Sequence, residues 1–156
     1  MSYIFDLRKL VGNQPLYVPS AGGYVYKNGK ILLQRRKDDG LWAINGGCLE
    51  MGETFEQALV RELKEELGIT VTKARPVAVL SGEKEYHVYP NGDKVYGIDA
   101  VFQVDEYEGE PTPDHDEVLE IGWFELDNLP ENMHIPDKNF VKYIREFIDN
   151  NEIQID

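Results

Sequence analysis

The sequence is poor in cysteine and contains no long apolar run. Its single cysteine, Cys48, cannot form a disulfide within the chain, which favours a reducing compartment. No apolar run reaches the length of about eighteen residues that a membrane-spanning helix requires. The opening residues, MSYIFDLRKLVG, lack the apolar stretch and the small-residue cleavage site of a secretory signal. Together these absences predict a cytoplasmic protein without a membrane partner.

Positive charge is also scarce. The chain has 16 Lys and Arg against 29 Asp and Glu, a formal net charge of −13. A protein that binds a nucleic-acid backbone needs clustered Lys and Arg, so a nucleic-acid polymer is not expected as a partner. A small phosphorylated substrate stays compatible with this charge if divalent cations mediate the contact. Over most of the surface, solubility explains the acidity.

The length and composition favour one folded domain over residues 1–156. A chain of 156 residues with 42% hydrophobic residues can bury a core but is short for two domains. The sequence has neither a Gly-x-Gly-x-x-Gly dinucleotide fingerprint nor a phosphate loop ending in Gly-Lys-Ser/Thr. If the protein binds nucleotides, it does so by other means.

Turn and strand signals predict a mixed sheet between helices, an α/β fold. The Asn28-Gly29 pair marks the turn of a first hairpin. Thr54, with Gln57 three residues on, forms a capping box that opens a helix, and Gly68 is placed to end it. The other expected helices are residues 2–11, as a short helix or an edge segment, and 137–150. The expected strands are 24–26, 31–34, 41–44, 70–72, 76–81, 86–89, 95–104 and 120–126, with a polar loop at 106–117.

Three glutamates of the central helix lie in an unusual position. At about 100° per residue, Glu62, Glu65 and Glu66 overlap the margin of the apolar face instead of the opposite, solvated one. Like charges four residues apart repel, and burial raises the penalty because carboxylates lose hydration. A divalent cation removes the difficulty. Oxygen ligands suit Mg²⁺, with Mn²⁺ as an alternative, whereas zinc prefers His or Cys, which are missing from this ridge.

The same segment resembles the Nudix box, Gly-x5-Glu-x7-Arg-Glu-U-x-Glu-Glu-x-Gly-U, in which U is a bulky aliphatic residue. Every specified position matches: Gly47, Glu53, Arg61, Glu62, Leu63, Glu65, Glu66, Gly68 and Ile69. The segments ILLQRR, LW…GG and E…WFELDNLP extend the resemblance to MutT-type Nudix hydrolases over most of the chain. Asn45 departs from the family, which commonly has proline before the two glycines, and this puts the local loop shape in doubt.

The resemblance implies a fold and a reaction. The Nudix fold is an α/β/α sandwich with a mixed β-sheet, in which the box forms a loop–helix–loop. Its enzymes use Mg²⁺ and water to cleave a nucleoside diphosphate linked to another moiety. The alternative reading is a non-catalytic Nudix-fold sensor that binds a nucleotide. Sensors often lose box carboxylates, and this chain keeps the complete set.

The resemblance also assigns roles to residues. Glu62, Glu65 and Glu66 are the expected metal ligands, with the backbone carbonyl of Gly46 as an additional one. Glu53 is expected to assist, and Arg61 to orient its neighbouring carboxylates. The family does not use one general base throughout. The candidates here are Glu53, Glu66 and a loop acid, for which Glu117 is preferred over Asp116 and Glu120.

The sequence gives few indications of which nucleotide the protein binds. Trp42 and Tyr86 are the candidates for binding the non-phosphate moiety, since aromatic rings stack on bases. Tyr86 lies at the distance from the box where some diadenosine-polyphosphate hydrolases carry tyrosine, whereas Glu85 replaces the proline of many ADP-ribose hydrolases. A nucleoside triphosphate, a dinucleoside polyphosphate and a nucleotide sugar such as ADP-ribose all stay open. A homodimer also stays open.

The cysteine and the histidines are expected to have structural roles. Cys48 occupies an unspecified position of the box and is interpreted as a packing residue. An isomerase of the related isoprenoid-diphosphate type is less favoured, because no plausible motif surrounds this cysteine. His87, His115 and His134 show no spacing typical of metal ligands.

Overall fold

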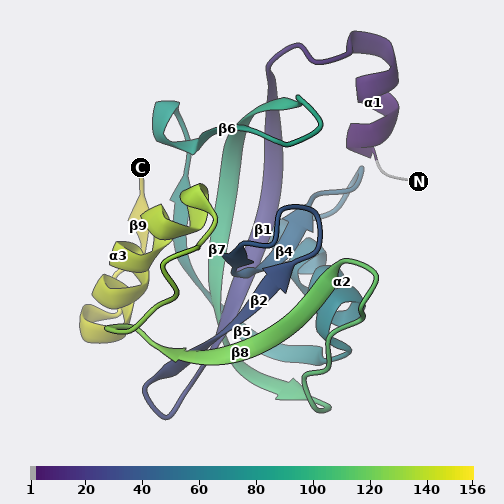
Figure 1. Cartoon of the computed structure of the whole chain (residues 1–156). Coiled ribbons are helices and arrows are strands. Elements are labelled where there is room, and N and C mark those ends of the chain that lie inside the picture. Colours follow the sequence, from purple (N-terminus) through teal and green to yellow (C-terminus); the bar gives the residue numbers. More distant parts are fainter. Residues whose placement is uncertain (1–2) are drawn as a thin grey trace.

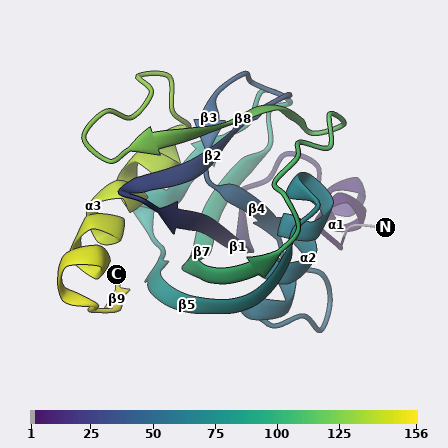
Figure 2. The same cartoon turned by 90° about the horizontal axis from the view of Figure 1, so that it is seen from below.

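A mixed β-sheet runs through the molecule, with helices on both of its faces (Figures 1 and 2). The computed structural model describes residues 3–156. The helices of this part are α1 (Tyr3–Val11), α2 (Phe55–Leu67), α3 (Ile135–Asn150) and the 3-10 turn η1 (Glu83–Glu85). Its strands are β1 (Leu16–Lys27), β2 (Lys30–Arg36), β3 (Trp42–Ala43), β4 (Asn45–Cys48), β5 (Thr70–Leu80), β6 (Tyr86–Val88), β7 (Lys94–Glu108), β8 (Val118–Glu125) and β9 (Gln154–Ile155).

The strands combine parallel and antiparallel pairs. Their order is β3-β2-β1-β7-β5-β9, while β4 pairs with β1, β6 with β7 and β8 with β2. β1 and β7 run parallel over ten paired positions, from Leu16↔Val95 to Val25↔Val104. β4 lies antiparallel on β1 in register Ser20↔Cys48 to Gly23↔Asn45. The expected mixed α/β architecture is confirmed.

Two core layers separate the helices from the sheet. Side chains of a strand alternate between its two faces, and β2 shows how this builds both layers at once. Leu32 packs with Leu59 and Leu63 of α2 in one buried cluster. Ile31 and Leu33 belong to the other cluster, which contains apolar residues of α3. A strand buried on both faces reads as a continuous apolar run, as ILL does here.

Helix α2 begins and ends where its sequence signals predict. The Thr54 side chain accepts a hydrogen bond from the Gln57 backbone N–H at 3.2 Å, and the Gln57 side chain accepts from the Thr54 N–H at 2.9 Å. At the other end Gly68 adopts φ 70°, and its N–H donates to the Lys64 carbonyl. Both caps of the helix that carries the box are confirmed.

The strand expected at 41–44 ends before the two glycines, as predicted, but the further strand that contains them was not expected. The strand predicted at 41–44 is β3, and the chain does not leave the sheet at residues 45–47 but continues as β4 on β1. Glycine is disfavoured in strand interiors, so the sequence pointed to a break. At Gly46, however, φ is 145° and a Cβ would overlap the Ala21 carbonyl oxygen of β1. A residue with a side chain does not fit this close approach of the two strands.

Two other boundaries also differ from the sequence prediction. The strands expected at 70–72 and 76–81 form one strand, β5, whose pairing with β7 shifts register around Lys73 and Pro76. β7 continues to Glu108, so the first three residues of the polar loop expected at 106–117 belong to a strand. Exposed charged side chains in these segments interrupt the alternation of apolar and polar residues that predicts a strand. β9 was not expected, and it pairs with β5.

The terminal elements agree better with expectation. Of the two options for residues 2–11, the helix is found at Tyr3–Val11, while Ser2 lies outside the described residues. The last helix starts two residues before the predicted position because Pro136 is favourable in its first turn. Across residues 3–156, no helix has the length and apolar character needed to cross a membrane.

Removing the cap of α2 should destabilise the protein modestly. Thr54→Ala deletes the acceptor for the Gln57 N–H and is expected to lower the free energy of unfolding by about 1 kcal/mol. Thr54→Ser keeps the hydroxyl and serves as the control, with a change below about 0.5 kcal/mol. Urea unfolding followed by circular dichroism measures both. Equal stability of the two variants would contradict the assigned capping role.

Candidate functional site

A buried carboxylate joins helix α2 to the glycine strand. Glu66 is 5% exposed. Its Oε1 accepts a hydrogen bond from Gln34 Nε2 at 2.8 Å, and its Oε2 accepts from the Gly46 backbone N–H at 2.8 Å. Burial raises the pKa of Glu66 to about 8, with the charges of Glu62 and Glu117 contributing. An ionised carboxylate here has two N–H donors and no bound cationic side chain.

Arg61 gathers the other glutamates of the box. Its Nε and Nη2 bind the two oxygens of Glu53 at 2.7 and 2.9 Å, and Nη1 contacts Glu62 Oε1 at 2.6 Å. Nη2 also donates to the Cys48 carbonyl at 3.0 Å, which ties helix α2 to the start of the box. The hydrogen bonds from Arg61 lower the pKa of Glu53 to about 2. Arg61 thus holds neighbouring carboxylates in place, as expected from the charge-assisted geometry of its fork.

Glu62 lies against the backbone of Gly47. A Cβ added at Gly47 would come within 2.6 Å of Glu62 Oε1, so the absence of a side chain admits this carboxylate. Burial is the main cause that raises the pKa of Glu62, and Arg61 opposes it. Glu65 differs, because its side chain is 60% exposed and reaches Arg61 only at 3.3 Å. Of the three glutamates expected at the apolar margin, Glu62 and Glu66 are largely buried and Glu65 points outward.

The residues around α2 fit a hard divalent cation by their chemistry. The donors are carboxylate oxygens, and the buried Oε1 of Gln34, beside Glu66, has no hydrogen-bond partner within the described part of the chain. Burial raises the pKa values of Glu62 and Glu66 and so disfavours their charged forms, which a bound divalent cation would favour. Within residues 3–156 no three His, Cys, Asp or Glu side chains are grouped so as to hold a metal ion. Arg61 draws Glu53, Glu62 and Glu65 toward itself instead.

The loop before β8 brings Glu117 near these carboxylates. The Asp114 backbone N–H donates to the Glu66 carbonyl at 3.1 Å, which fixes the loop on the end of α2. Asp114 Oδ1 accepts from the N–H groups of Asp116, Glu117 and Val118 at 3.0 to 3.2 Å. The charge of Glu117 contributes to the raised pKa values of Glu62 and Glu66, so this exposed acid lies within electrostatic reach of both.

The structure places the two aromatic candidates away from the cavity described next. Trp42 is half-buried and packs edge-on against Phe124, with ring centroids 4.8 Å apart. Tyr86 is 38% exposed, and its ring is tilted against that of Tyr96, with ring centroids also 4.8 Å apart. Neither ring lines the cavity. Their roles in substrate binding stay predictions.

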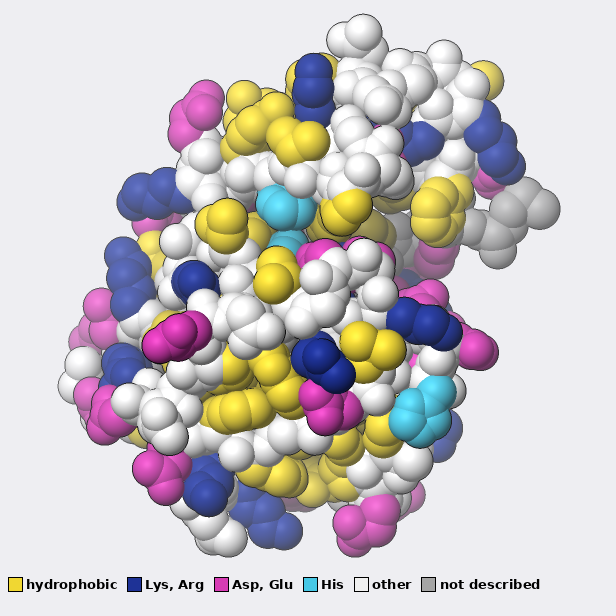
Figure 3. All heavy atoms as spheres, viewed as in Figure 1, with side chains coloured by type: hydrophobic (Ala, Val, Ile, Leu, Met, Phe, Trp, Pro, Cys, Tyr) yellow, Lys and Arg dark blue, Asp and Glu magenta, His cyan; other side chains and the backbone are white. Residues whose placement is uncertain are grey.

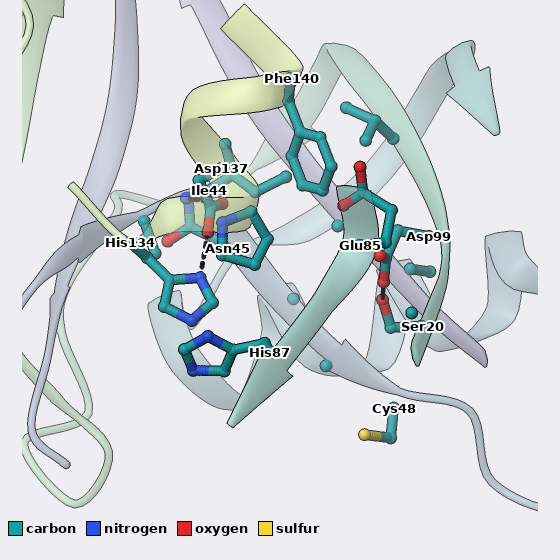
Figure 4. A pocket seen from close by; sticks show the side chains of 18 of the residues that line it. Ser20, Ile44, Asn45, Cys48, Glu85, His87, Asp99, His134, Asp137 and Phe140 are labelled. Atoms are coloured by element: carbon teal, nitrogen blue, oxygen red, sulfur yellow. Dashed lines mark hydrogen bonds and ion pairs between the residues drawn. The ribbon is translucent and has the colours of Figure 1, made fainter. Parts of the chain in front are cut away.

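A cavity of about 130 Å³ adjoins the first residues of the box. β1, β4, β6, β7 and the start of α3 enclose it, and Figure 4 shows its polar side chains. The polar residues that line it include Ser20, Asn45, Glu85, His87, Asp99, His134 and Asp137. Sequence reasoning assigned no substrate-binding role to these residues, because they come from separate elements and share no spacing. Histidines also show at the middle of the face seen in Figure 3.

Cys48 lies at the edge of this cavity as a neutral thiol. Burial raises its pKa to about 11, and the surrounding carboxylates act in the same direction. A thiol that keeps its proton at neutral pH is a poor nucleophile. This is consistent with a packing role for Cys48.

Comparison with known proteins identifies the family. The model of the NUDIX domain matches residues 16–144. A MutT NUDIX hydrolase from Burkholderia pseudomallei superposes with a TM-score of 0.70 at 29% identity, covering 84% of this chain and 98% of that one. The fold and the box therefore define a Nudix-fold domain of the MutT type. The chain belongs to the NUDIX family and is a Nudix hydrolase by sequence and fold.

Two relatives show how far the likeness extends. An ADP-ribose pyrophosphatase from Methanocaldococcus jannaschii is 35% identical over 127 residues, which are 79% of this chain and 70% of that protein. A NAD-capped RNA hydrolase NudC from Vibrio vulnificus is 36% identical over 108 residues, 68% of this chain. The chain spans only 38% of the length of that second relative. The expected resemblance to Nudix hydrolases is confirmed.

The two glycines of β4 should respond differently to a methyl group. Gly46→Ala forces a Cβ onto the backbone of β1 at a φ that L-residues avoid, and should lower the free energy of unfolding by about 2 kcal/mol or more. Gly47→Ala meets a side chain, the carboxylate of Glu62, and no backbone atom, so it should cost less than Gly46→Ala. Thermal and urea unfolding compare them. A larger loss for Gly47→Ala would contradict the geometry described for β4.

Proposed function

We propose that this chain hydrolyses a pyrophosphate bond in a nucleoside diphosphate linked to another moiety, in a reaction that depends on Mg²⁺. The observation that carries the proposal is the complete set of box carboxylates, with Glu66 buried between Gln34 and Gly46 and Arg61 binding its neighbours. A binding module has no need to bury carboxylates at this energetic cost. The non-catalytic sensor is therefore the second candidate.

Glu62, Glu65, Glu66 and the Gly46 carbonyl are the proposed ligands of the cation, with Mn²⁺ as a possible substitute for Mg²⁺. A divalent cation at this position supplies neutralisation of the phosphate oxygens and acidification of water. In the structure Glu62 and Glu65 contact Arg61, so binding of the cation by all three glutamates requires these two side chains to change partner.

Glu117 is the proposed general base. Both oxygens of Glu53 accept hydrogen bonds from Arg61, through Nε and Nη2, and the low pKa of Glu53 makes it a weak proton acceptor. Glu66 is buried and already accepts two hydrogen bonds. Glu117 is exposed and lies on a loop that Asp114 fixes beside the end of α2, so it can reach a water molecule next to bound phosphates.

The substrate is proposed to be a small nucleotide derivative. A nucleoside triphosphate, a dinucleoside polyphosphate and a nucleotide sugar such as ADP-ribose fit the proposed chemistry equally. One relative is named an ADP-ribose pyrophosphatase and another a NAD-capped RNA hydrolase, and the second is much longer than this chain. With a net charge of −13, and with Lys and Arg scattered among acids on the face of Figure 3, we propose no nucleic-acid polymer as a partner. A homodimer and a cytoplasmic location stay predictions.

Glu66 is expected to be essential for turnover. With Mg²⁺, the protein should release a nucleoside monophosphate from at least one member of a panel of nucleotide diphosphate derivatives. Glu66→Gln should lower kcat at least about a hundredfold, as expected for loss of a charged group that acts on the transition state. Glu56→Gln, an exposed change in the first turn of the same helix, is the control and should keep the parent rate. Equal rates for Glu66→Gln and the parent protein would refute the role of Glu66.

Glu117 should affect proton transfer and not cation binding. Glu117→Gln is expected to lower kcat by about a hundredfold, a typical contribution of general base catalysis. Its affinity for Mn²⁺, measured by electron paramagnetic resonance, should stay nearly unchanged. Glu110→Gln changes an exposed acid at the start of the same loop and serves as the control. Loss of Mn²⁺ affinity in Glu117→Gln would instead assign this residue as a metal ligand.

A further inference from the structure

Strand β2 carries one buried amide in a run that is otherwise apolar. The residues Ile31, Leu32, Leu33 and Gln34 are all buried, and Gln34 is 4% exposed. Since the side chains of a strand alternate, Gln34 lies on the same face as Leu32, which packs with residues of helix α2. A buried amide is unfavourable unless its N–H and C=O groups find hydrogen-bond partners. Leucine at this place would pack without that cost, so the polar group needs another explanation.

The contacts of Gln34 account for one end of its amide. Nε2 donates a hydrogen bond to Glu66 Oε1 at 2.8 Å. An ionised carboxylate can only accept hydrogen bonds, so the amide nitrogen faces Glu66 and the amide oxygen faces away. That oxygen, Oε1, is buried and has no hydrogen-bond partner among the residues that the structure describes. Gln34 thus binds Glu66 with one end and presents an acceptor with the other.

A second buried glutamine shows what a structural amide looks like in this fold. Gln103, on β7, is 7% exposed. Its Oε1 accepts from the Tyr24 hydroxyl at 3.1 Å, and its Nε2 donates to Asp105 Oδ1 at 3.0 Å. Within the described chain both ends of the Gln103 amide are therefore satisfied, whereas only one end of the Gln34 amide is.

The two carboxylates that these glutamines bind also differ in how their charge is compensated. Asp105 accepts two further hydrogen bonds from Arg75, at 2.6 and 2.9 Å. Glu66 accepts from two neutral donors, the Gln34 amide and the Gly46 backbone N–H. Neutral donors orient a carboxylate without cancelling its charge, so an ionised Glu66 keeps its attraction for a cation.

The free end of the Gln34 amide suits a hydrated cation. Mg²⁺ usually keeps several water molecules when a protein binds it. The O–H groups of such water donate hydrogen bonds, and Gln34 Oε1 is an acceptor. Residues that hold the ligands of a metal ion by hydrogen bonds strengthen metal binding, and their loss typically costs about 10- to 100-fold in affinity. Gln34 has the contacts and the chemistry of such a residue.

We infer that Gln34 is a positioning residue of the cation site, although it lies outside the box. Its Nε2 keeps the Glu66 carboxylate in the orientation that binds the cation, and its Oε1 accepts from water that the cation brings. The inference rests on the proposed function for the presence of a divalent cation at Glu66. It gives strand β2 a part in cation binding that the pattern of the box does not indicate.

Binding of Mn²⁺ tests the inference without turnover. Gln34→Met replaces the amide with an unbranched apolar side chain of similar length, and the electron paramagnetic resonance signal of free Mn²⁺ measures the dissociation constant. Gln34→Met should raise this constant at least about tenfold, as for the loss of other residues that orient metal ligands. A rise of less than about twofold, well below the effect of such residues, would overturn the inference.

Gln103→Met is the matched control, because it removes the same amide from a carboxylate elsewhere in the sheet. Both variants should lower the urea midpoint of unfolding, since each takes a hydrogen bond from a carboxylate. Only Gln34→Met should weaken Mn²⁺ binding. An equal loss of Mn²⁺ affinity in Gln103→Met would reveal a general effect of destabilisation and overturn the inference.

Stability in the presence of Mn²⁺ gives a second measurement. A cation that binds only the folded protein raises its stability by an amount that depends on the ratio of cation concentration to dissociation constant. At one fixed Mn²⁺ concentration, the urea midpoint should therefore rise by similar amounts in the wild-type protein and in Gln103→Met, and by less in Gln34→Met. An equal rise in the two variants would contradict the assigned role.

A shorter amide covers the case in which Gln34→Met fails to fold. Gln34→Asn keeps the amide group and withdraws it from Glu66 by one methylene group. It should also raise the Mn²⁺ dissociation constant, because the hydrogen bond to Glu66 Oε1 is lost. An unchanged affinity in Gln34→Asn would overturn the inference.

The inference and the proposed function fail in different ways. Hydrolysis of a panel member, together with unchanged Mn²⁺ affinity in Gln34→Met, would overturn the inference and leave the proposed function. Weakened Mn²⁺ binding in Gln34→Met, without hydrolysis of any panel member by the wild-type protein, would support the inference and refute the proposed function. Absence of Mn²⁺ binding by the wild-type protein would overturn the inference, whatever the result of the hydrolysis assay.

Discussion

The burial of the Glu66 carboxylate is the constraint on which the rest of the site depends. One oxygen accepts from a side chain of β2 and the other accepts from the backbone of β4, so a single carboxyl group fixes a helix against two strands. Such a group is unfavourable in an apolar interior unless donors surround it. The strand that supplies one donor must come close to β1, and this approach requires Gly46. The glycines of β4, helix α2 and the Glu66 carboxyl group therefore depend on one another for their positions.

β4 separates two environments with different chemistry. On one side it contacts the box helix, where Glu62 lies against Gly47 and Glu66 binds Gly46. Its residues also line the cavity that ends at Glu85 and His134. The short strand β4 therefore lies between the box carboxylates and the cavity.

The sequence predicted those parts of the protein whose signals are local. The caps at Thr54 and Gly68 depend on neighbouring residues, and both are found where expected. The partial burial of Glu62 and Glu66 followed from helical periodicity, although Glu65 points outward because Arg61 and solvent satisfy it. Local signals in the sequence therefore predict the position and the buried face of the box helix.

Features that depend on distant partners could not be predicted in this way. β4 pairs with β1, and only the close approach of the two backbones explains glycines inside a strand. β5 bends around shifts in register with β7, which no local pattern reveals. The cavity brings together Glu85, Asp99 and His134 from three elements. Taken singly in the sequence, each of these residues is typical of a surface or structural position. They form a common cavity wall only because the fold brings them close together.

The two walls of the cavity differ in how much of the surrounding structure depends on them. On one wall, Asp137 has two tasks, since it accepts from the backbone beside β4 and also orients His134, so its replacement would disturb the strand and the histidine together. On the other wall, Glu85 ends a short turn and leaves one oxygen without a structural partner in the described chain. A substitution at Glu85 would therefore disturb fewer structural contacts than one at Asp137. Tolerance to sequence change in this cavity is greatest where a side chain has no structural partner.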